Sequence, residues 1–387
     1  MRYRVNCHPA LGGLTDHNTE YKGRLYGPEI ELFTMKGRKL CQVPDSVFER
    51  TPVSPELGSA QLEISGGPFD ALADMHKFIR SKTAEIIESL PEEVSLIPLA
   101  YAGSSYDSGA VCTLTDTYLR REASQRYAVL RNLFGDRFVQ KAARTGSDQL
   151  NVGGIDEEDA FAVFRLLRSY LPIFAAFSGA SPFNTFGSLY VSNSPINPGR
   201  TTTISSYRLF EYKNAISAIE GKKIDFKKLI PPAFESLAHY LTDLESLSYP
   251  HPNTMYYFIR PMPHRGVAAE IRIMDKQPSN SETMALFALA KGLVNSGIER
   301  NVSDCELGEE IEEAAITGIY NVRLFYDILQ TASENLPAEE RQYLTPLERR
   351  IIHGNVADKI VTIASEYGMD TVFSLMVKSL YEDVAFT

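Results

Sequence analysis

The stretch AAEIRIMDKQPS, residues 268–279, has the alternating pattern of a β-strand but an unusual polar face. Its apolar side chains, together with the valine at position 267, would share one face of the strand. Glu270 and Arg272 would project from the other face, about 7 Å apart. A strand that is apolar on one side and carries a carboxylate beside a guanidinium on the other predicts a polar site built on a sheet.

Three other predicted strands have the same pattern. Each places two polar side chains at positions i and i+2 between apolar neighbours: Glu29 and Glu31 in GPEIELF, Gln61 and Glu63 in AQLEIS, and Gln149 and Asn151 in DQLNVGG. An ordinary solvent-facing sheet would also contain Thr, Lys and Ser. With the first strand included, the polar positions hold four Glu, three carboxamides and one Arg.

If these polar faces meet in one sheet, four carboxylates lie close together and repel one another unless cations are present. Oxygen ligands without thiolate or imidazole suit Mg²⁺ or Mn²⁺. Arg272 would supply a planar, charged fork for a phosphoryl group. The combination favours metal-assisted phosphoryl transfer. Taken strand by strand, solvated edge strands that carry Glu explain the same residues equally well.

Composition bounds the class of protein. The 387 residues are 44% hydrophobic, enough for a large core in one domain or two. The formal net charge of -10 argues against a nucleic-acid partner, which would require clustered Lys and Arg. The first residues lack the apolar region of a signal peptide, and no segment approaches 18 uninterrupted apolar residues. We therefore expect a cytoplasmic protein without a membrane partner.

Several common sites are not indicated by the sequence. Cys7, Cys41, Cys112 and Cys305 are far apart and form no CxxC pair, so reduced thiols are expected rather than disulfides or a thiolate metal site. The seven His residues are dispersed, without HxH or HExxH. The chain also lacks a GxxxxGK[ST] loop and a GxGxxG turn after a strand, which disfavours P-loop and Rossmann nucleotide sites.

The remaining pattern is largely helical. Helices are expected at residues 70–90, 156–177 and 231–247. In the next predicted helix, Ser279 and Glu282 have capping-box spacing and Gly297 could end the helix. From there to the C-terminus the chain reads as helices. The predicted fold class is α+β, an antiparallel sheet backed by helices, with a helical C-terminal region.

In this order, the same stretches resemble the motifs of carboxylate–amine ligases of the glutamate–cysteine ligase type, whose catalytic sheet is related to that of glutamine synthetase. The resemblance runs from Gly27 to Ser279 and rests on six motifs: GPEIELF, PELGSAQLEISGGP, QRYAVLRNLFG, DQLNVGG, FSGASPF and AEIRIMDKQPS. It implies a curved antiparallel catalytic sheet of the glutamine synthetase type. It also implies a single catalytic domain, residues 1–387, with a sheet-containing core at 1–280 and a helical region at 281–387.

The resemblance implies ATP-dependent amide-bond formation through an acyl phosphate, with Mg²⁺ or Mn²⁺ as the metal. Two or three metal ions would be held by four carboxylates: Glu29, Glu31, Glu63 and Glu270. Gln149 or Asn151 would lie near the second ion. Arg272 would stabilise the transferring γ-phosphoryl group. Arg272 and the metal-holding Glu63 are therefore the expected catalytic residues.

Further nucleotide or substrate contacts are implied by position, at Gln61, Arg126, Tyr127, Arg208 and Asp275. For the two arginines a plain surface role is a comparable interpretation. Asp275 is equally expected to orient Arg272 or Lys276.

Two departures from the family pattern stand out. Ala180 replaces an Asn that many relatives have before Ser-Pro-Phe, which removes a side-chain contact there. Some branches have His-x-His where this chain has Gln149 and Asn151, so direct metal ligation from that strand would be weaker or absent here.

The leading functional hypothesis is an ATP:glutamate ligase that makes a γ-glutamyl amide, with cysteine as the first candidate amine. Its partners would be small-molecule substrates, and a homo-oligomer stays open. One alternative is an amide hydrolase on the same fold, of the kind that removes a small protein modifier. Another is a non-catalytic nucleotide-binding protein.

Overall fold

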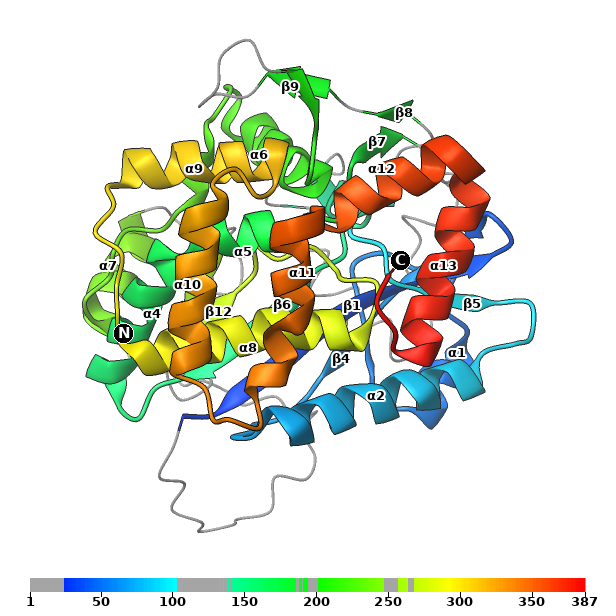
Figure 1. The fold of residues 1–387 in the computed structure, drawn as a ribbon, viewed down its shortest axis with the longest axis horizontal. Helices are drawn as coiled ribbons and strands as arrows, with labels where there is room; N and C mark the ends of the chain where they lie inside the picture. Colours follow the sequence, from blue (N-terminus) through cyan, green and yellow to red (C-terminus); the bar gives the residue numbers. More distant parts are fainter. Residues whose placement is uncertain are drawn as a thin grey trace.

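The protein is built around one antiparallel sheet that is flanked by layers of helices (Figure 1). The computed structural model describes residues 24–102, 132, 135, 138–139, 141–185, 188–189, 191–193, 201–246, 257–263 and 268–386. The sheet is open and has eight strands. Their spatial order is β11 (Ile259–Met262), β12 (Ala268–Ile271), β6 (Asp148–Gly153), β1 (Tyr26–Lys36), β4 (Gln61–Ser65) and β3 (Ser54–Pro55), with β2 (Lys39–Leu40) and β5 (Ser95–Ile97) also paired to β1.

The four strands with the polar pattern are neighbours in this sheet, in the order β12, β6, β1 and β4. Their register aligns the polar positions: Glu31 is opposite Glu63, Glu29 is opposite Gln149, and Asn151 is opposite Glu270. Directly opposed residues in a sheet project to the same face. The expected convergence of these faces is therefore confirmed.

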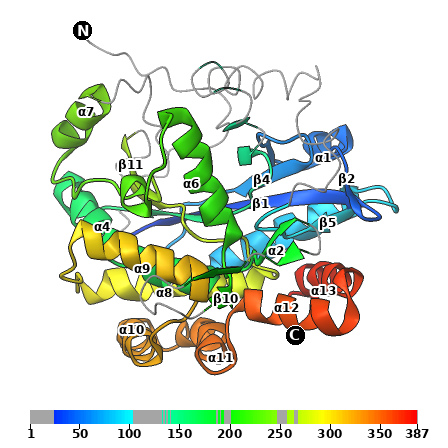
Figure 2. The ribbon, with the colours of Figure 1, turned by 90° about the horizontal axis from the view of Figure 1, so that it is seen from above.

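The other face of the same strands is apolar and forms the core. Its side chains are at most 1% exposed: Ile30, Leu32, Leu62, Ile64, Leu150, Val152, Ala269 and Ile271. Helices α2 and α4 contact these strands, and α8 packs against both helices. Figure 2 shows α8 on this side of the sheet, with α10 and α11 as a second helical layer outside it. Burial of one face fixes the register, because a slip by one residue would expose every apolar side chain.

The described helices are α1 (Asp45–Arg50), α2 (Leu72–Ser89), α4 (Glu157–Ser169), α5 (Leu171–Ser178), α6 (Tyr207–Glu220), α7 (Leu237–Ser246), α8 (Asn280–Ser296), α9 (Asp304–Thr317), α10 (Val322–Glu334), α11 (Thr345–His353), α12 (Val356–Tyr367) and α13 (Met369–Glu382). The expected helices and the helical C-terminal region are present, and α1 and α6 are helices that were not expected. Short 3₁₀ turns are η1 (Phe226–Leu229) and η4 (Arg341–Leu344). Two further hairpin-like pairs are β7 (Phe183–Thr185) with β8 (Ser188–Leu189), and β9 (Val191–Asn193) with β10 (Thr201–Thr203).

Helix ends follow the local chemistry. The side chain of Ser279 accepts a hydrogen bond from the Glu282 N–H at the start of α8, and Gly297 ends the helix with a φ of 64°. Both features were expected.

The single helix predicted over residues 156–177 is wrong in one respect. The structure has two helices there, α4 and α5, which are separated at Tyr170 and meet at 54°. Pro172 cannot donate a backbone hydrogen bond and so starts a new helix.

The helix predicted over residues 231–247 is shorter than expected. It begins at Leu237, directly after Ser236, whose hydroxyl accepts a hydrogen bond from the His239 N–H at 3.2 Å, and its described part ends at Ser246. Within the described residues, no single helix is long and apolar enough to cross a membrane; only the bent α4–α5 pair meets those criteria, and α5 is buried throughout. Cys41 and Cys305 are free thiols, and the other two cysteines lie outside the described residues.

Candidate active site

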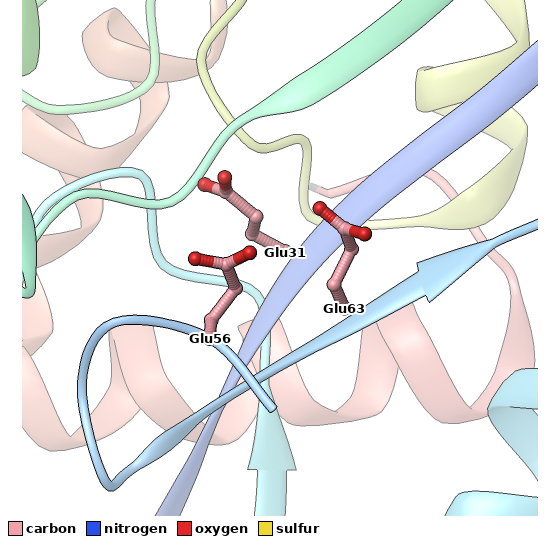
Figure 3. A group of neighbouring side chains, drawn as sticks. All are labelled: Glu31, Glu56 and Glu63. Carbon is pink, nitrogen blue, oxygen red and sulfur yellow. The ribbon is translucent and has the colours of Figure 1, made fainter. Parts of the chain in front are cut away.

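Three carboxylates gather on the polar face where β1 and β4 pair. Glu31 and Glu63 are opposed in register, and Glu56 reaches them from the turn between β3 and β4 (Figure 3). One ligand oxygen from each lies within 4.8 Å of the other two, and all three residues are partly buried. Carboxylate oxygens in this arrangement are a donor set for a hard divalent cation.

The turn that carries Glu56 is held by Gln61. The Gln61 side chain accepts a hydrogen bond from the Gly58 N–H at 2.9 Å and donates one to the Thr145 carbonyl at 2.7 Å. A Cβ at Gly58 would lie 2.6 Å from Gln61 Oε1 and 2.9 Å from the Ala143 carbonyl, so only glycine fits this close approach. Gln61 was expected to contact nucleotide or substrate; in the structure its amide holds the loop beneath the carboxylates.

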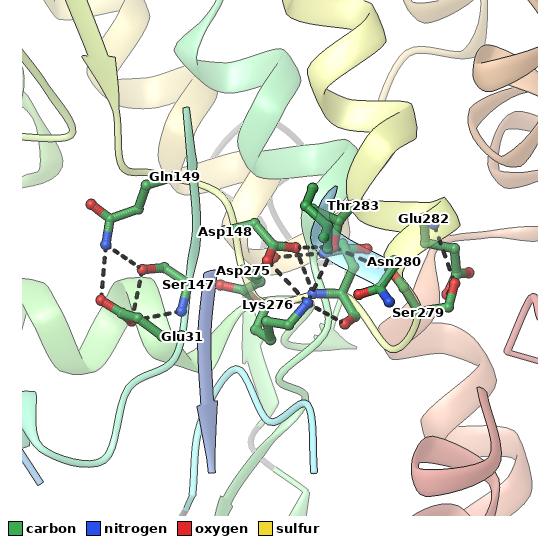
Figure 4. A network of polar contacts seen from close by, with 12 residues as sticks. Glu31, Ser147, Asp148, Gln149, Asp275, Lys276, Ser279, Asn280, Glu282 and Thr283 are labelled. Atoms are coloured by element: carbon green, nitrogen blue, oxygen red, sulfur yellow. Dashed lines mark hydrogen bonds and ion pairs between the residues drawn. The ribbon is translucent and has the colours of Figure 1, made fainter. Parts of the chain in front are cut away.

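Glu31 is the most constrained member of this group. Its carboxylate accepts hydrogen bonds from the Ser147 N–H and hydroxyl, both at 2.8 Å, and from Gln149 Nε2 at 2.8 Å (Figure 4). Burial, reinforced by the negative charge of Glu56, nevertheless raises its pKa from 4.5 to about 8. The charges of Arg208 and Arg272 oppose this rise without cancelling it. Additional positive charge at this position would therefore favour the ionised form of Glu31.

The other end of the polar face has a different charge balance. Glu270 is 1% exposed and is paired with Arg260, the residue opposite it on β11. Arg272 Nε lies 3.6 Å from the same Glu270 oxygen and 3.4 Å from Gln149 Oε1. Arg272 follows β12 and its side chain is 23% exposed, so the guanidinium is held from one side and accessible from the other.

Asn151 connects the two central strands at this end. Its Nδ2 donates to Glu29 Oε1 at 3.1 Å and, at 3.3 Å, to the Gly27 carbonyl. Its Oδ1 is buried and has no hydrogen-bond partner among the described residues. A buried carbonyl oxygen without a donor costs free energy, which a cation or a donor from a ligand would recover. The oxygen-only donor set around it fits Mg²⁺ or Mn²⁺.

Arg208 and Asp275 form a buried pair beside this face. Arg208 Nη2 donates to the Arg272 carbonyl at 2.8 Å, and Nη1 lies 3.4 Å from Asp275. Asp275 also accepts hydrogen bonds from the Ser181 and Ser206 hydroxyls at 2.8 Å. The expectation that Asp275 orients Arg272 or Lys276 was wrong, because the partner comes from α6, far away in the sequence. Being fully buried, Asp275 acts as a support for Arg208.

Ala180, which stands where many relatives have Asn, contacts Asp275 through its backbone. The Ala180 N–H donates to Asp275 Oδ2 at 3.0 Å, a contact that does not require a side chain. The candidate residues Arg126 and Tyr127 lie outside the described residues.

A second buried ion pair anchors the polar strands to α8. Lys276 Nζ lies 3.0 Å from Asp148 Oδ1, and both residues are fully buried. Thr283 of α8 donates to Asp148 Oδ2 at 2.7 Å (Figure 4). The Gln277 N–H donates to the same oxygen at 2.9 Å. Asp148 immediately precedes Gln149, so this network fixes the start of β6 and with it the carboxamides on the polar face.

A known family of proteins matches most of this chain. The sequence model of glutamate–cysteine ligase family 2 matches residues 26–186 and 190–318. The chain belongs to glutamate–cysteine ligase family 2. The polar-face strands β1, β4, β6 and β12 all lie inside the matched residues.

Members and structural relatives of the family are distant in sequence. The chain is 26% identical over 239 residues to an uncharacterized protein of Archaeoglobus fulgidus. It is 25% identical over 278 residues to a Ruegeria pomeroyi protein whose name is "Putative glutamate--cysteine ligase 2". These matches span 60% and 63% of the two relatives, and 59% and 69% of this chain. The chain thus spans less than two thirds of the curated relatives that it matches.

A solved glutamate–cysteine ligase of Francisella tularensis, in complex with AMP, has a similar fold, with a TM-score of 0.67 at 12% identity. The similarity covers 93% of this chain and 88% of that chain. The expected glutamine synthetase-type ligase fold is therefore confirmed.

Sequence reasoning missed two residues of the candidate site. Glu56 stands at the start of the motif PELGSAQLEISGGP but outside any alternating strand, so its acidic side chain was not singled out. Arg260 lies in FIRPMP, where it alternates with apolar neighbours in the same way as the other polar-face residues. The signal was present in both cases: a motif position for Glu56 and period-2 alternation for Arg260.

Proposed function

We propose that this protein is an ATP-dependent carboxylate–amine ligase that activates the γ-carboxylate of glutamate and joins it to an amine, with cysteine as the first candidate. The observation that carries the proposal is the group Glu31, Glu56 and Glu63 on the same sheet face as Arg272. Membership of glutamate–cysteine ligase family 2 supports it. The solved Francisella tularensis enzyme is in complex with AMP, which supports nucleotide binding by this chain.

The proposed reaction has two covalent steps. An oxygen of the γ-carboxylate attacks the γ-phosphorus of ATP, and ADP leaves with the electrons of the broken P–O bond. The amine then attacks the acyl carbon, phosphate leaves with the electrons of the C–O bond, and the amine loses a proton. Activation is needed because a free carboxylate is a poor electrophile. When bound, divalent cations supply neutralisation of phosphate charge.

The residues divide into three roles in this proposal. Glu31, Glu56 and Glu63 hold one divalent cation, which makes Glu63 part of the catalytic centre. Arg272, accessible on one side, binds the transferring phosphoryl group, and Gln149 keeps both Arg272 and Glu31 in place through its amide.

The second part of the site receives the nucleotide. Glu29 and Asn151 would supply oxygens to a divalent cation bound together with ATP, and Asn151 Oδ1, which has no hydrogen-bond partner among the described residues, is the oxygen available for it. Arg208 is near enough to Glu31 for its charge to oppose the rise in the Glu31 pKa, so it adds positive potential for an anionic substrate.

The test is turnover of purified protein with ATP, Mg²⁺ and glutamate over a panel of amines, with phosphate release as the readout. Amine-dependent phosphate release with formation of a γ-glutamyl amide is expected. Absence of turnover with every amine would contradict the proposal. Release of amine from γ-glutamyl amides without net ATP consumption would favour a hydrolase instead.

Three broader properties are part of the same proposal. The protein acts as a single catalytic domain, in which the sheet-containing core at residues 1–280 and the helical region at 281–387 form one unit. It acts in the cytoplasm. Its partners are small-molecule substrates, without nucleic acid or membrane.

A further inference from the structure

The end of α5 is capped by groups from other parts of the chain. The last carbonyls of a helix have no partner within the helix. Of the four carbonyls at residues 176–179, three accept hydrogen bonds from residues 350–357, which lie beyond residue 318, where the family match ends. The four bonds run from Asn355 Nδ2 to Ala176 at 3.2 Å, from Arg350 Nη1 to Phe177 at 2.6 Å, from Gln277 Nε2 to Ser178 at 2.8 Å, and from the Ala357 N–H to Gly179 at 3.0 Å. The helical C-terminal region therefore completes the end of α5.

Asn355 meets Ser205 where four segments of the chain converge. Asn355 Nδ2 also donates to Ser205 Oγ at 2.5 Å, and both residues are buried. A Cβ at Gly179 would lie 2.0 Å from Ser205 Oγ, and a Cβ at Gly318 would lie 2.4 Å from Asn355 Nδ2. Both distances are too short for a side chain, so glycine is required at each position. The contact between Asn355 and Ser205 is therefore enclosed by close-packed backbone and has little room to shift.

The segment that Asn355 holds leads directly to Arg208. Ser206, the residue after Ser205, donates from its hydroxyl to Asp275 Oδ1 at 2.8 Å. Arg208 Nη1 donates to the same Asp275 oxygen at 3.4 Å, and Arg208 Nη2 donates to the Arg272 carbonyl at 2.8 Å. A shift of Ser205 therefore moves the guanidinium of Arg208, both along the chain and through Asp275.

We infer that Asn355 is a positioning residue for the candidate active site, because it fixes Ser205, the start of α6 and, through them, Arg208. The inference rests on the proposed function, in which Arg208 adds positive potential for anionic glutamate. Asn355 acts through Ser205 and Arg208 rather than by touching glutamate. The helical C-terminal region is then part of the working site, in addition to covering the core.

Two variants remove the contact from opposite sides. Asn355→Ser keeps a good N-cap oxygen for α12, where Asn355 Oδ1 accepts from the Asp358 N–H, but it loses the amide donor. Ser205→Ala removes the acceptor and leaves α12 unchanged. Each variant should raise the KM for glutamate about five- to tenfold with little change in kcat, because the displaced charge is lost from the ground state and the transition state alike. The double variant should be little worse than either single variant, because both break the same contact.

A matched control is available in Asn321, the exposed N-cap of α10. Its side chain accepts from the Leu324 N–H at 3.1 Å. Asn321→Ser makes the same substitution at the same kind of helix position and should leave both kcat and KM unchanged. Circular dichroism and thermal unfolding establish that each variant is folded. If Asn355→Ser does not fold, Ser205→Ala, which removes only one buried hydroxyl, carries the test.

Amide hydrogen exchange measures the positioning without any turnover. The N–H groups of Ser205 and Ser206 donate to the Ala315 carbonyl, and those of Tyr207 and Arg208 donate to the Ser181 carbonyl and hydroxyl. Exchange at residues 205–208 should be at least about tenfold faster in Asn355→Ser and Ser205→Ala, because local opening becomes easier when the segment loses its anchor. It should stay at the wild-type rate in Asn321→Ser.

The outcomes separate this inference from the proposed function. A wild-type KM for glutamate in the folded Asn355→Ser and Ser205→Ala variants would overturn the inference, as would wild-type exchange at residues 205–208. Fully additive effects in the double variant would overturn it too, because the two side chains would then act independently. Absence of wild-type turnover with every amine would overturn the proposed function. Exchange then decides the placement of Arg208 by Asn355 alone: faster exchange upholds it, and unchanged exchange rejects it.

Discussion

Glu31 of β1 and Glu63 of β4 are directly opposed across the sheet, and Glu56 places a third carboxylate within 4.8 Å of both. Directly opposed like charges destabilise a sheet. This crowding, with Glu31 also accepting three hydrogen bonds, fits the proposed cation site, because residues that lower stability are concentrated at functional sites.

Replacement of Glu56 by Gln tests this cation site. Without divalent cations the variant should be more stable than wild type by roughly 1–2 kcal/mol, because the Glu56 charge, which lies close to Glu63 and opposes ionisation of Glu31, is gone. Mg²⁺ should then stabilise the variant far less than wild type. Urea unfolding with and without Mg²⁺ measures both effects. Glu88→Gln, an exposed change on α2, is the control. A Glu56→Gln variant that gains the wild-type stabilisation from Mg²⁺ would contradict the assignment.

The raised pKa of Glu31 predicts a pH dependence of cation binding. Below a pH of about 8, Glu31 is protonated in the empty site, so a cation must displace the proton. Apparent affinity for Mn²⁺ should fall roughly tenfold per pH unit below about pH 8 and level off above it. Titrations at several pH values measure this. A pH-independent affinity across that range would contradict the coupling between the proton and the cation.

The raised pKa of Glu31 also predicts how the stability of the cation-free protein changes with pH. The pKa of Glu31 is higher in the folded state than its ordinary 4.5, so the folded state binds more protons than the unfolded state between these values. Stability should therefore fall as pH rises from 4.5 to about 8. Saturating Mg²⁺ should remove this loss. Unfolding free energies measured with and without Mg²⁺ across this window check the sign, and a rise in the cation-free stability attributable to Glu31 would contradict it.

Arg272→Gln tests the proposed phosphoryl contact. The side chain is held by Gln149 and Glu270 yet remains 23% exposed, as a group that meets substrate requires. Loss of a preorganised charge at a transferring phosphoryl group should lower kcat roughly 10²- to 10³-fold, with a smaller effect on the KM for ATP. Arg323→Gln, at a side chain 92% exposed on α10, should leave both constants unchanged. Equal kcat in the Arg272 variant and wild type would exclude the role.

Much of the sheet could be predicted from sequence because its strands alternate strictly. In β1, β4, β6 and β12 one buried apolar face dictates where the polar residues point, so Glu31 and Glu63 had to share a face once the strands paired. Glu56 lies on a turn, and its approach depends on the close Gly58–Gln61 contact, which no periodicity encodes.

The errors have similar physical origins. Arg260 was missed because Pro261 makes its short strand look irregular, although a proline is tolerated on the edge strand β11. Asp275 was expected to orient Arg272 or Lys276, which are close to it in the sequence. Tertiary packing decides which positively charged side chain reaches a buried carboxylate, and the sequence pattern does not show this. Arg208, the partner of Asp275, is brought in by α6.

Lys276→Met tests the buried network that fixes β6. The variant leaves the fully buried Asp148 carboxylate without its cation, so the protein should lose about 3–5 kcal/mol of unfolding free energy. Adding Asp148→Asn removes the uncompensated charge and should restore part of that loss, because two neutral side chains replace one lone ion. Urea unfolding of wild type, both single variants and the double variant gives the coupling energy. Purely additive losses would show that the two side chains do not stabilise each other, and that the start of β6 is fixed by packing alone.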